Sequence, residues 1–183
     1  RDAFVTDRTG VSAQQEVEFG PQVAFGRRAY IFQYGYRFER THTFDRDPDA
    51  FIPLDIRFNL APLTTTFTHD TRDEILDATR GQFYSTALEY APSSLGSDIR
   101  FVKFFGQYFR YMPFFTPAST PFDNKRPRPR LVWAGGVRAG LASGLGGQTL
   151  VPSERFFAGG GTTIRGFAQD GLGPVDFSGL PTG

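Results

Sequence analysis

Apolar and polar residues alternate along this chain in runs of about ten positions, and each run ends in a turn signal. The clearest run extends from Tyr30 to Arg40, where an aromatic side chain occupies every second position down to Phe38. Period two places alternate residues on opposite sides of a β-strand. The run therefore predicts a strand with one aromatic face and one face that carries Arg37 and Glu39. A soluble sandwich would pack the aromatic face against a second sheet, whereas a membrane barrel would turn it to lipid.

Further segments repeat this pattern with varying clarity. Strands are predicted at about residues 11–19, 25–42, 55–70, 81–91, 99–112 and 130–143. The segment 99–112 is aromatic on both sides, which leaves its orientation open. At Pro62 the alternation suggests a slip of one residue, as at a bulge or a bend. The pattern predicts an all-β antiparallel meander of about six strands, followed by a long Gly- and Pro-rich loop, 144–183, without alternation.

The composition of the chain excludes several classes of site and of protein. The chain has 21 Phe, 7 Tyr, 21 Gly and no Cys, and 20 basic residues against 19 acidic ones give a net charge of +1. Disulfides and thiolate metal sites are excluded, and the charge balance offers no basic face for nucleic acid. The mean hydropathy of −0.31 argues against a helical membrane protein, but alternating membrane strands also average to such values. Arg1 to Phe4 contain neither an initiator Met nor a signal-peptide core, so we expect the chain to begin inside a longer or processed protein.

The most informative segment runs from Pro152 to Pro174. It contains Phe156-Phe157-Ala158-Gly159-Gly160 and then Ile164-Arg165-Gly166-Phe167. The glycines do not form a P-loop, because no Gly-Lys-Ser/Thr follows them. Ser153 and Ser178 lack the Gly-x-Ser-x-Gly frame of a nucleophile elbow. A plain flexible loop remains an alternative, although a solvated linker would not carry this many apolar side chains.

These residues resemble the loop-six signature of the Omp85 superfamily, Val-Arg-Gly-Phe/Tyr, with Ile164 in place of the usual Val. Other similarities follow in the same order along the chain. Asp70-Thr71-Arg72-Asp73 with Asp77-Ala78-Thr79-Arg80-Gly81 resembles the periplasmic turn of the family, Glu89-Tyr90 and Phe101-Val102-Lys103 resemble the next two strands, and Gly144 to Gly147 with Leu150 to Pro152 resembles the entry to loop six. The resemblance extends from about Asp70 to Pro174.

The resemblance implies a partial barrel domain over 1–183, the central part of a 16-stranded transmembrane β-barrel. It also implies a set of site residues. They are the loop-six motif Ile164, Arg165, Gly166 and Phe167, its supports Phe156, Phe157, Gly159, Gly160, Gly173 and Pro174, and the turn motif Asp70, Arg72, Asp73, Arg80 and Gly81. In the family, loop six folds into the barrel and its Arg pairs with a carboxylate on a later strand, which we expect beyond Gly183. Glu39 and Glu89 are conceivable substitutes, but nothing in the sequence selects them.

The function implied is assembly, insertion or translocation of proteins at the bacterial outer membrane, by strand templating and local perturbation of the bilayer. No chemical catalysis, cofactor or metal is expected. The expected partners are membrane lipid, unfolded outer-membrane or secreted proteins, and periplasmic accessory proteins that bind POTRA domains outside this chain. The alternatives are an outer-membrane diffusion channel or receptor without insertase role, and a soluble β-sandwich binding module. An enzyme activity is expected only from a fused domain outside the chain.

Overall fold

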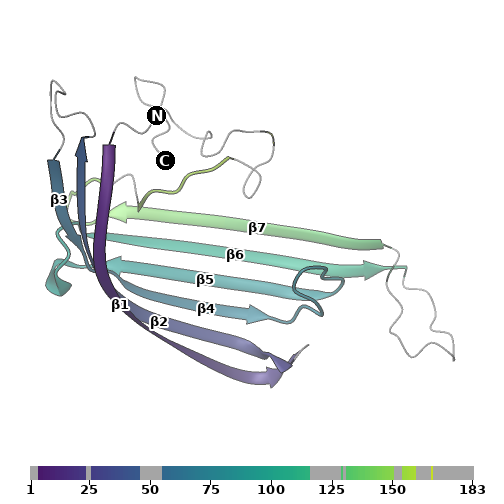
Figure 1. The fold of residues 1–183 in the computed structure, drawn as a ribbon. Helices are drawn as coiled ribbons and strands as arrows, with labels where there is room; N and C mark the ends of the chain where they lie inside the picture. Colours follow the sequence, from purple (N-terminus) through teal and green to yellow (C-terminus); the bar gives the residue numbers. More distant parts are fainter. Residues whose placement is uncertain are drawn as a thin grey trace.

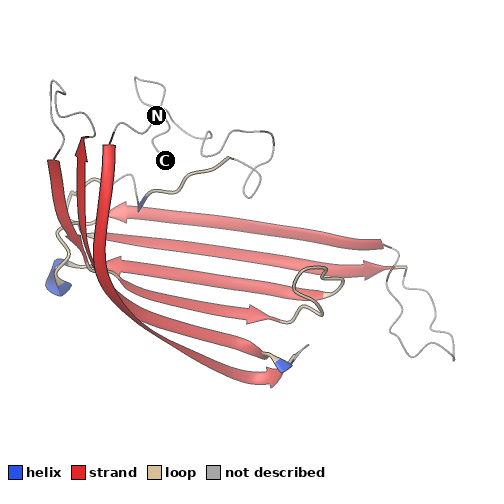
Figure 2. Cartoon of the chain, viewed as in Figure 1, coloured by secondary structure: helices blue, strands red, loops and turns tan. Residues whose placement is uncertain are grey.

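The computed structural model describes residues 4–23, 26–45, 55–115, 129, 131–150, 154–159 and 166. These residues form one antiparallel seven-stranded sheet (Figures 1 and 2). Its strands are β1 (Phe4–Gln22), β2 (Arg28–Asp45), β3 (Asp55–Leu60), β4 (Leu63–Asp70), β5 (Gly81–Ala91), β6 (Phe101–Phe114) and β7 (Leu131–Gly144), with a 3-10 turn at Ser93–Leu95. The strand order is β1-β2-β4-β5-β6-β7, with β3 also paired to β2. The expected all-β antiparallel meander is therefore confirmed.

No helix among the described residues is long and apolar enough to cross a membrane.

The segment around Pro62 bends but does not slip. β3 pairs with β2 from Glu39↔Leu60, and β4 pairs with β2 from Tyr36↔Leu63, so both strands follow one register. Pro62 has no N–H for the ladder, yet its carbonyl still accepts a hydrogen bond from the Arg37 backbone N–H at 3.1 Å. Of the two expected features, the bulge is thus wrong and the bend is present: β3 stands nearly upright while β4 runs along the sheet (Figure 1).

The first two strands extend further than the apolar pattern indicates. β1 begins at Phe4, well before residue 11, and β2 runs to Asp45. Their extensions pair with each other from Arg8↔Thr41 to Phe4↔Asp45. The pattern missed them because Arg8, Thr9 and Gly10 offer no apolar alternation. Cross-strand hydrogen bonding, which does not depend on side-chain polarity, continues the ladder there.

The register separates the sheet into two faces. The face that we call the aromatic face carries Val11, Val17, Phe19, Tyr30, Phe32, Tyr34, Tyr36, Phe38, Leu63, Phe67, Tyr84, Leu88, Tyr90, Val102, Phe104, Tyr108, Met112, Phe114, Leu131, Trp133, Val137 and Leu141. Many of these side chains are more than a third exposed. The opposite face, the polar face, carries Glu16, Gln33, Arg37, Glu39, Thr64, Thr66, Thr68, Asp70, Ser85, Glu89, Lys103, Gln107 and Arg138.

The register also orients β6, which the sequence left open. Phe104 is opposite Leu88 and Tyr108 is opposite Tyr84, so both lie on the aromatic face. Phe101, Phe105 and Phe109 lie on the polar face, and loop residues cover part of this second aromatic row.

A small core closes one end of the polar face. Leu60, Ala91 and Phe101 are buried, and Phe58, Ile99 and Leu150 pack around them. Leu150 follows β7, so the first part of the loop joins this core. Residues 154–159 then run along the concave side of the sheet (Figure 1).

Candidate functional site

Asp70 organises the turn between β4 and β5. Its carboxylate accepts hydrogen bonds from Arg72 Nε at 2.9 Å and Nη2 at 2.8 Å, a bidentate arrangement. The Arg72 backbone N–H donates to the same carboxylate at 3.0 Å. The Arg72 guanidinium lies 4.7 Å from the centre of the Phe83 ring. A planar guanidinium suits both contacts at once, whereas a lysine would not.

Asp73 closes the same turn through backbone groups. One of its oxygens accepts from the backbone N–H groups of Glu74, Thr79 and Arg80 at 2.9 to 3.1 Å, and the other accepts from the Thr79 hydroxyl. Burial alone raises the pKa of the Asp73 carboxyl, but these hydrogen bonds outweigh it and hold the pKa below its ordinary 3.8. Arg80 takes part in this turn through its backbone N–H.

Gly81 is required where the turn enters β5. Its φ is +104°, and a Cβ there would lie 2.4 Å from the Thr71 carbonyl oxygen. The close approach arises because Thr71 pairs with Gln82 through a backbone bond of 2.9 Å. A positive φ together with this contact leaves room only for glycine.

Arg27 connects this turn to the preceding one, a contact that no pattern in the sequence indicates. Its Nη1 donates to Asp70 at 2.9 Å, while its Nε and Nη2 are buried without a partner among the described residues. Arg27 belongs to the β1–β2 connection, where the Val23 N–H donates to its carbonyl at 2.8 Å. The two turns therefore lie at the same end of the sheet, and Asp70 is shared between them.

At the opposite end, the loop that follows β7 is tied to the β5–β6 connection. The Gln148 side chain accepts from the Arg100 backbone N–H at 2.7 Å and donates to the Asp98 carbonyl at 3.2 Å. The Leu145 N–H donates to the Arg100 carbonyl at 2.8 Å. This part of the chain and Leu150 fix where the loop starts its course over the polar face.

We call residues 154–159 the loop stem. Glu154 is 6% exposed and its carboxylate lies 3.4 Å from Lys103 Nζ. The same ammonium lies 5.2 Å from the centre of the Phe156 ring, which packs against Phe105 at 6.1 Å. Gly140 of β7 leaves room for the Phe156 ring, because a Cβ there would come within 2.9 Å of that ring. The stem is thus attached to β6 and β7 by one ion pair and one ring.

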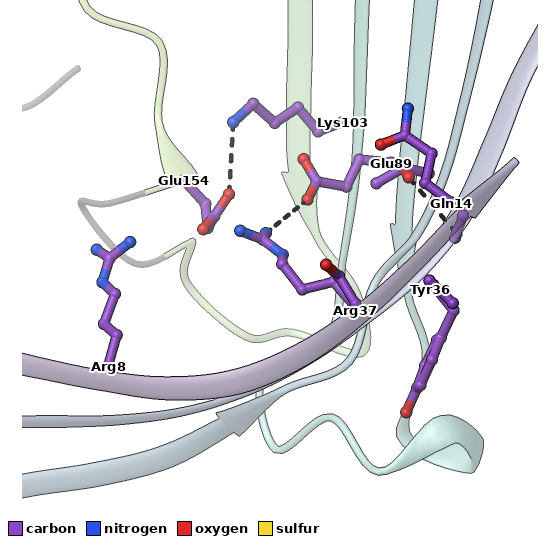
Figure 3. Close-up of a pocket in the computed structure, with 11 residues that line it drawn as sticks. Arg8, Gln14, Tyr36, Arg37, Glu89, Lys103 and Glu154 are labelled. Atoms are coloured by element: carbon purple, nitrogen blue, oxygen red, sulfur yellow. Dashed lines mark hydrogen bonds and ion pairs between the residues drawn. The ribbon is translucent and has the colours of Figure 1, made fainter. Parts of the chain in front are cut away.

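Charged side chains line the polar face beside the stem (Figure 3). Arg37 contacts Glu89 at 3.0 Å and Glu39 at 3.5 Å, and Arg8 contacts Glu39 at 3.7 Å. Lys103 is the direct cross-strand partner of Glu89. A groove of about 490 Å³ is lined by Arg8, Arg37, Glu89, Lys103 and Glu154 among others. Both conceivable substitutes for the partner of Arg165 are therefore already engaged by Arg37.

The structure covers the expected site residues unevenly. All five turn residues are described, and of the loop supports Phe156, Phe157 and Gly159 lie in the stem, where Gly159 is buried. Of the loop-six tetrad only Gly166 is described; its φ is +93° and it is exposed. The remaining expected residues lie outside the described part of the chain: Gly160, Ile164, Arg165, Phe167, Gly173 and Pro174.

A family model described as the Omp85 superfamily domain matches residues 2–183. The chain belongs to the Omp85 superfamily. It is 31% identical over 117 residues to a SAM50-like protein of Schizosaccharomyces pombe, a match that covers 62% of this chain and 22% of the relative. It is 27% identical over 146 residues to the outer membrane protein assembly factor BamA of Nitratidesulfovibrio vulgaris, covering 78% of this chain and 17% of the relative. The chain spans about a fifth of the length of these curated relatives.

Membership in the Omp85 superfamily makes the chain an integral outer-membrane β-barrel protein. The two faces of the sheet then have different surroundings. Outward side chains of such a barrel meet lipid and inward ones meet a polar interior. The aromatic face is accordingly the lipid-facing surface, and the stem lies on the interior wall of the Omp85 sheet.

Glu154, Lys103 and Arg27 are the contacts that sequence reasoning missed. Glu154 stands two residues before the Phe156-Phe157 pair, and Lys103 directly follows Phe101-Val102, whose pattern predicts only a strand. The sequence signal for Glu154 was an acidic residue in a loop otherwise rich in Gly and Pro. Its partner could not be chosen without the register that places Lys103 on the polar face.

Proposed function

We propose that this Omp85 chain is part of a barrel that assembles other proteins into the outer membrane or moves them across it. The observation that supports this most is the loop stem on the polar face, held by Glu154 and Phe156, within a chain matched along 2–183 by the family model. One relative is named an outer membrane protein assembly factor. A loop anchored inside the wall suits a barrel that must stay rigid while it handles another chain.

The proposed action involves no chemical step. A barrel of this kind offers backbone hydrogen-bonding groups to incoming strands and perturbs the bilayer around them, which lowers the barrier to insertion. Unfolded outer-membrane or secreted proteins would be its substrates, lipid its surroundings, and periplasmic accessory proteins its partners through POTRA domains outside this chain. In this scheme the stem residues Glu154 and Phe156, with Arg165 further along, stiffen the wall.

Cells depleted of the native full-length protein test this proposal. They would be complemented with the wild type, with Phe156→Ala, or with the matched variant Phe104→Ala, which removes a ring of the same size from the lipid-facing side of β6. The readout is the fraction of a model outer-membrane protein that is folded, judged by heat-modifiable mobility and normalised to the amount of the barrel. Phe156→Ala should lower this fraction, whereas Phe104→Ala should leave it near the wild-type value.

A diffusion channel is the second candidate, because charged side chains line the groove on the polar face. It predicts that depletion of the full-length protein leaves other outer-membrane proteins folded. It also predicts that Arg37→Gln changes ion conductance in planar bilayers. That pair of results would replace the assembly proposal.

A further inference from the structure

Arg110 is a charged residue on the lipid-facing aromatic face. It lies on β6 between Tyr108 and Met112, and its side chain is exposed. Phe114 continues the same face beyond Met112. Apolar or aromatic side chains therefore flank this cation in both directions along the strand.

Neighbouring strands hold the Arg110 side chain in place. Its direct partner on β5 is Gln82, whose Oε1 accepts from Arg110 Nη1 at 3.0 Å and from the Tyr108 hydroxyl at 3.3 Å. Its partner on β7 is Gly135, and the Trp133 indole lies over that glycine, with ring carbons 2.5 and 2.7 Å from where a Cβ would stand. The guanidinium thus shares its acceptor with the Tyr108 hydroxyl, and the Trp133 indole lies over its partner residue on β7.

The strands around Arg110 supply no counter-charge on this surface. Every residue of β4, β5, β6 and β7 is described, and the outward positions of these four strands hold neither Asp nor Glu. A cation facing lipid is unfavourable deep in the bilayer and tolerated near its surface. Tyr and Trp are enriched at that surface. The anion present there is the phosphate of a phospholipid headgroup.

We propose that Arg110, together with Gln82 and Tyr108, binds the phosphate of a phospholipid headgroup on the outer wall of the barrel. A guanidinium has five donors and matches a phosphate in bidentate fashion. Gln82 orients the guanidinium, and the Tyr108 hydroxyl can turn its single O–H from Gln82 Oε1 to a second phosphate oxygen when the headgroup binds. The inference rests on the membrane location of the chain and is independent of what the barrel transports or assembles.

Trp133 provides a local reporter of lipid binding, since it is the only tryptophan of the chain. The full-length protein is reconstituted in phosphatidylcholine vesicles that contain a small fraction of phosphatidylglycerol with a nitroxide on its headgroup. Emission of the Trp133→Phe variant is subtracted to isolate the Trp133 signal. Arg110→Gln should lower the association of the labelled lipid about fivefold, the expected effect of one basic side chain near a membrane surface. Arg110→Lys keeps the charge and should retain most of the association.

Arg28→Gln is the matched control, because it removes the same charge from β2, several strands away. It should leave the quenching of Trp133 unchanged. Gln82→Leu, which keeps Arg110 but removes its acceptor, should shift the association in the same direction as Arg110→Gln and serves if that variant does not fold. Quenching that is equal in the wild type, Arg110→Gln and Gln82→Leu would overturn the proposal. So would loss of the wild-type quenching when millimolar inorganic phosphate is added, because the site would then read free phosphate.

Discussion

Removing Lys103 should release the loop stem from the wall of the Omp85 sheet. Lys103→Met keeps an unbranched side chain one atom shorter and leaves the Glu154 carboxylate, 6% exposed, without its ammonium. The same change removes the cation that lies over the Phe156 ring. Glu89 keeps its contact with Arg37 at 3.0 Å, so the perturbation is centred on the stem.

The expected free-energy cost of Lys103→Met follows from the burial of the Lys103–Glu154 ion pair and the distance between its charges. Exposed pairs contribute at most about 1 kcal/mol, whereas breaking a fully buried pair costs about 3–5 kcal/mol. Glu154 and Lys103 are 8% and 22% exposed in their side chains, at 3.4 Å separation, which places this pair between the two limits. We expect a cost of about 2–3 kcal/mol, equivalent to a roughly thirtyfold or larger increase in the population of the detached stem.

Cysteine labelling measures that population. Ala158→Cys places a thiol within the stem of a chain that has no cysteine of its own, in a full-length protein freed of other thiols. Maleimide labelling in membranes should accelerate in Lys103→Met and change little in Thr66→Val, a control on the polar face of β4. The double variant with Glu154→Gln should recover part of the loss. Strict additivity of the two single variants, within about 0.5 kcal/mol, would refute the coupling argued here.

Three further predictions concern the turn between β4 and β5. Gly81→Ala should cost about 1–3 kcal/mol, because φ is +104° and the Thr71 carbonyl lies 2.4 Å from the new Cβ; the midpoint of thermal loss of the folded form reports it. Asp70→Asn should cost about 2–3 kcal/mol, since the charge that holds Arg27 is lost; denaturant unfolding from detergent reports it. The pKa of Asp73 is lower in the folded turn than its ordinary 3.8. The Asp73 carboxylate therefore stabilises the folded form above that value, and this stabilisation is lost as pH falls through the folded pKa. Asp73→Asn should therefore reduce the difference in stability between pH 6 and pH 3, and an undiminished difference would contradict this assignment.

The meander was predictable because period two survives in the sequence wherever one face meets lipid and the other does not. Tyr30 to Phe38 display this in β2, and the structure places all five aromatic residues on one face. Strand segments without such an aromatic face show no alternating pattern in the sequence. Arg8, Thr9 and Gly10 of β1 are polar or small on both sides, so the extension of the strand depends on its pairing with β2.

The contacts of the site were less predictable, because they depend on register. The sequence places Lys103 and Glu154 in separate segments, and only the pairing of β5, β6 and β7 sets which face Lys103 occupies. The turn is different, since Asp70 and Arg72 are close in sequence and their association is local. Arg27 joins them from a distant turn, a contact that no local pattern encodes.

We call the stretch of each strand whose outward positions carry apolar or aromatic side chains the apolar band. Its place along each strand, together with the register, fixes how the strands lie relative to the membrane. On β1 the band begins at Val11, level with Phe38 of β2. On β7 the band runs from Leu141 to Leu131. The register across β4, β5 and β6 places Leu141 level with Tyr34 of β2, and Leu131 beyond the level of Tyr30. The band therefore moves along the strands from β1 to β7, as strands tilted by about 35–45° require.

This displacement decides the environment of Arg110. Arg28 is level with it on β2 and lies just past the aromatic run that ends at Tyr30. On β6 the band has shifted, so that Met112 and Phe114 still follow Arg110. Two arginines at the same level of the sheet thus differ in depth. Arg28 lies past the edge of the band, where water can solvate it, whereas Arg110 remains within the band and depends on a lipid phosphate for its counter-charge.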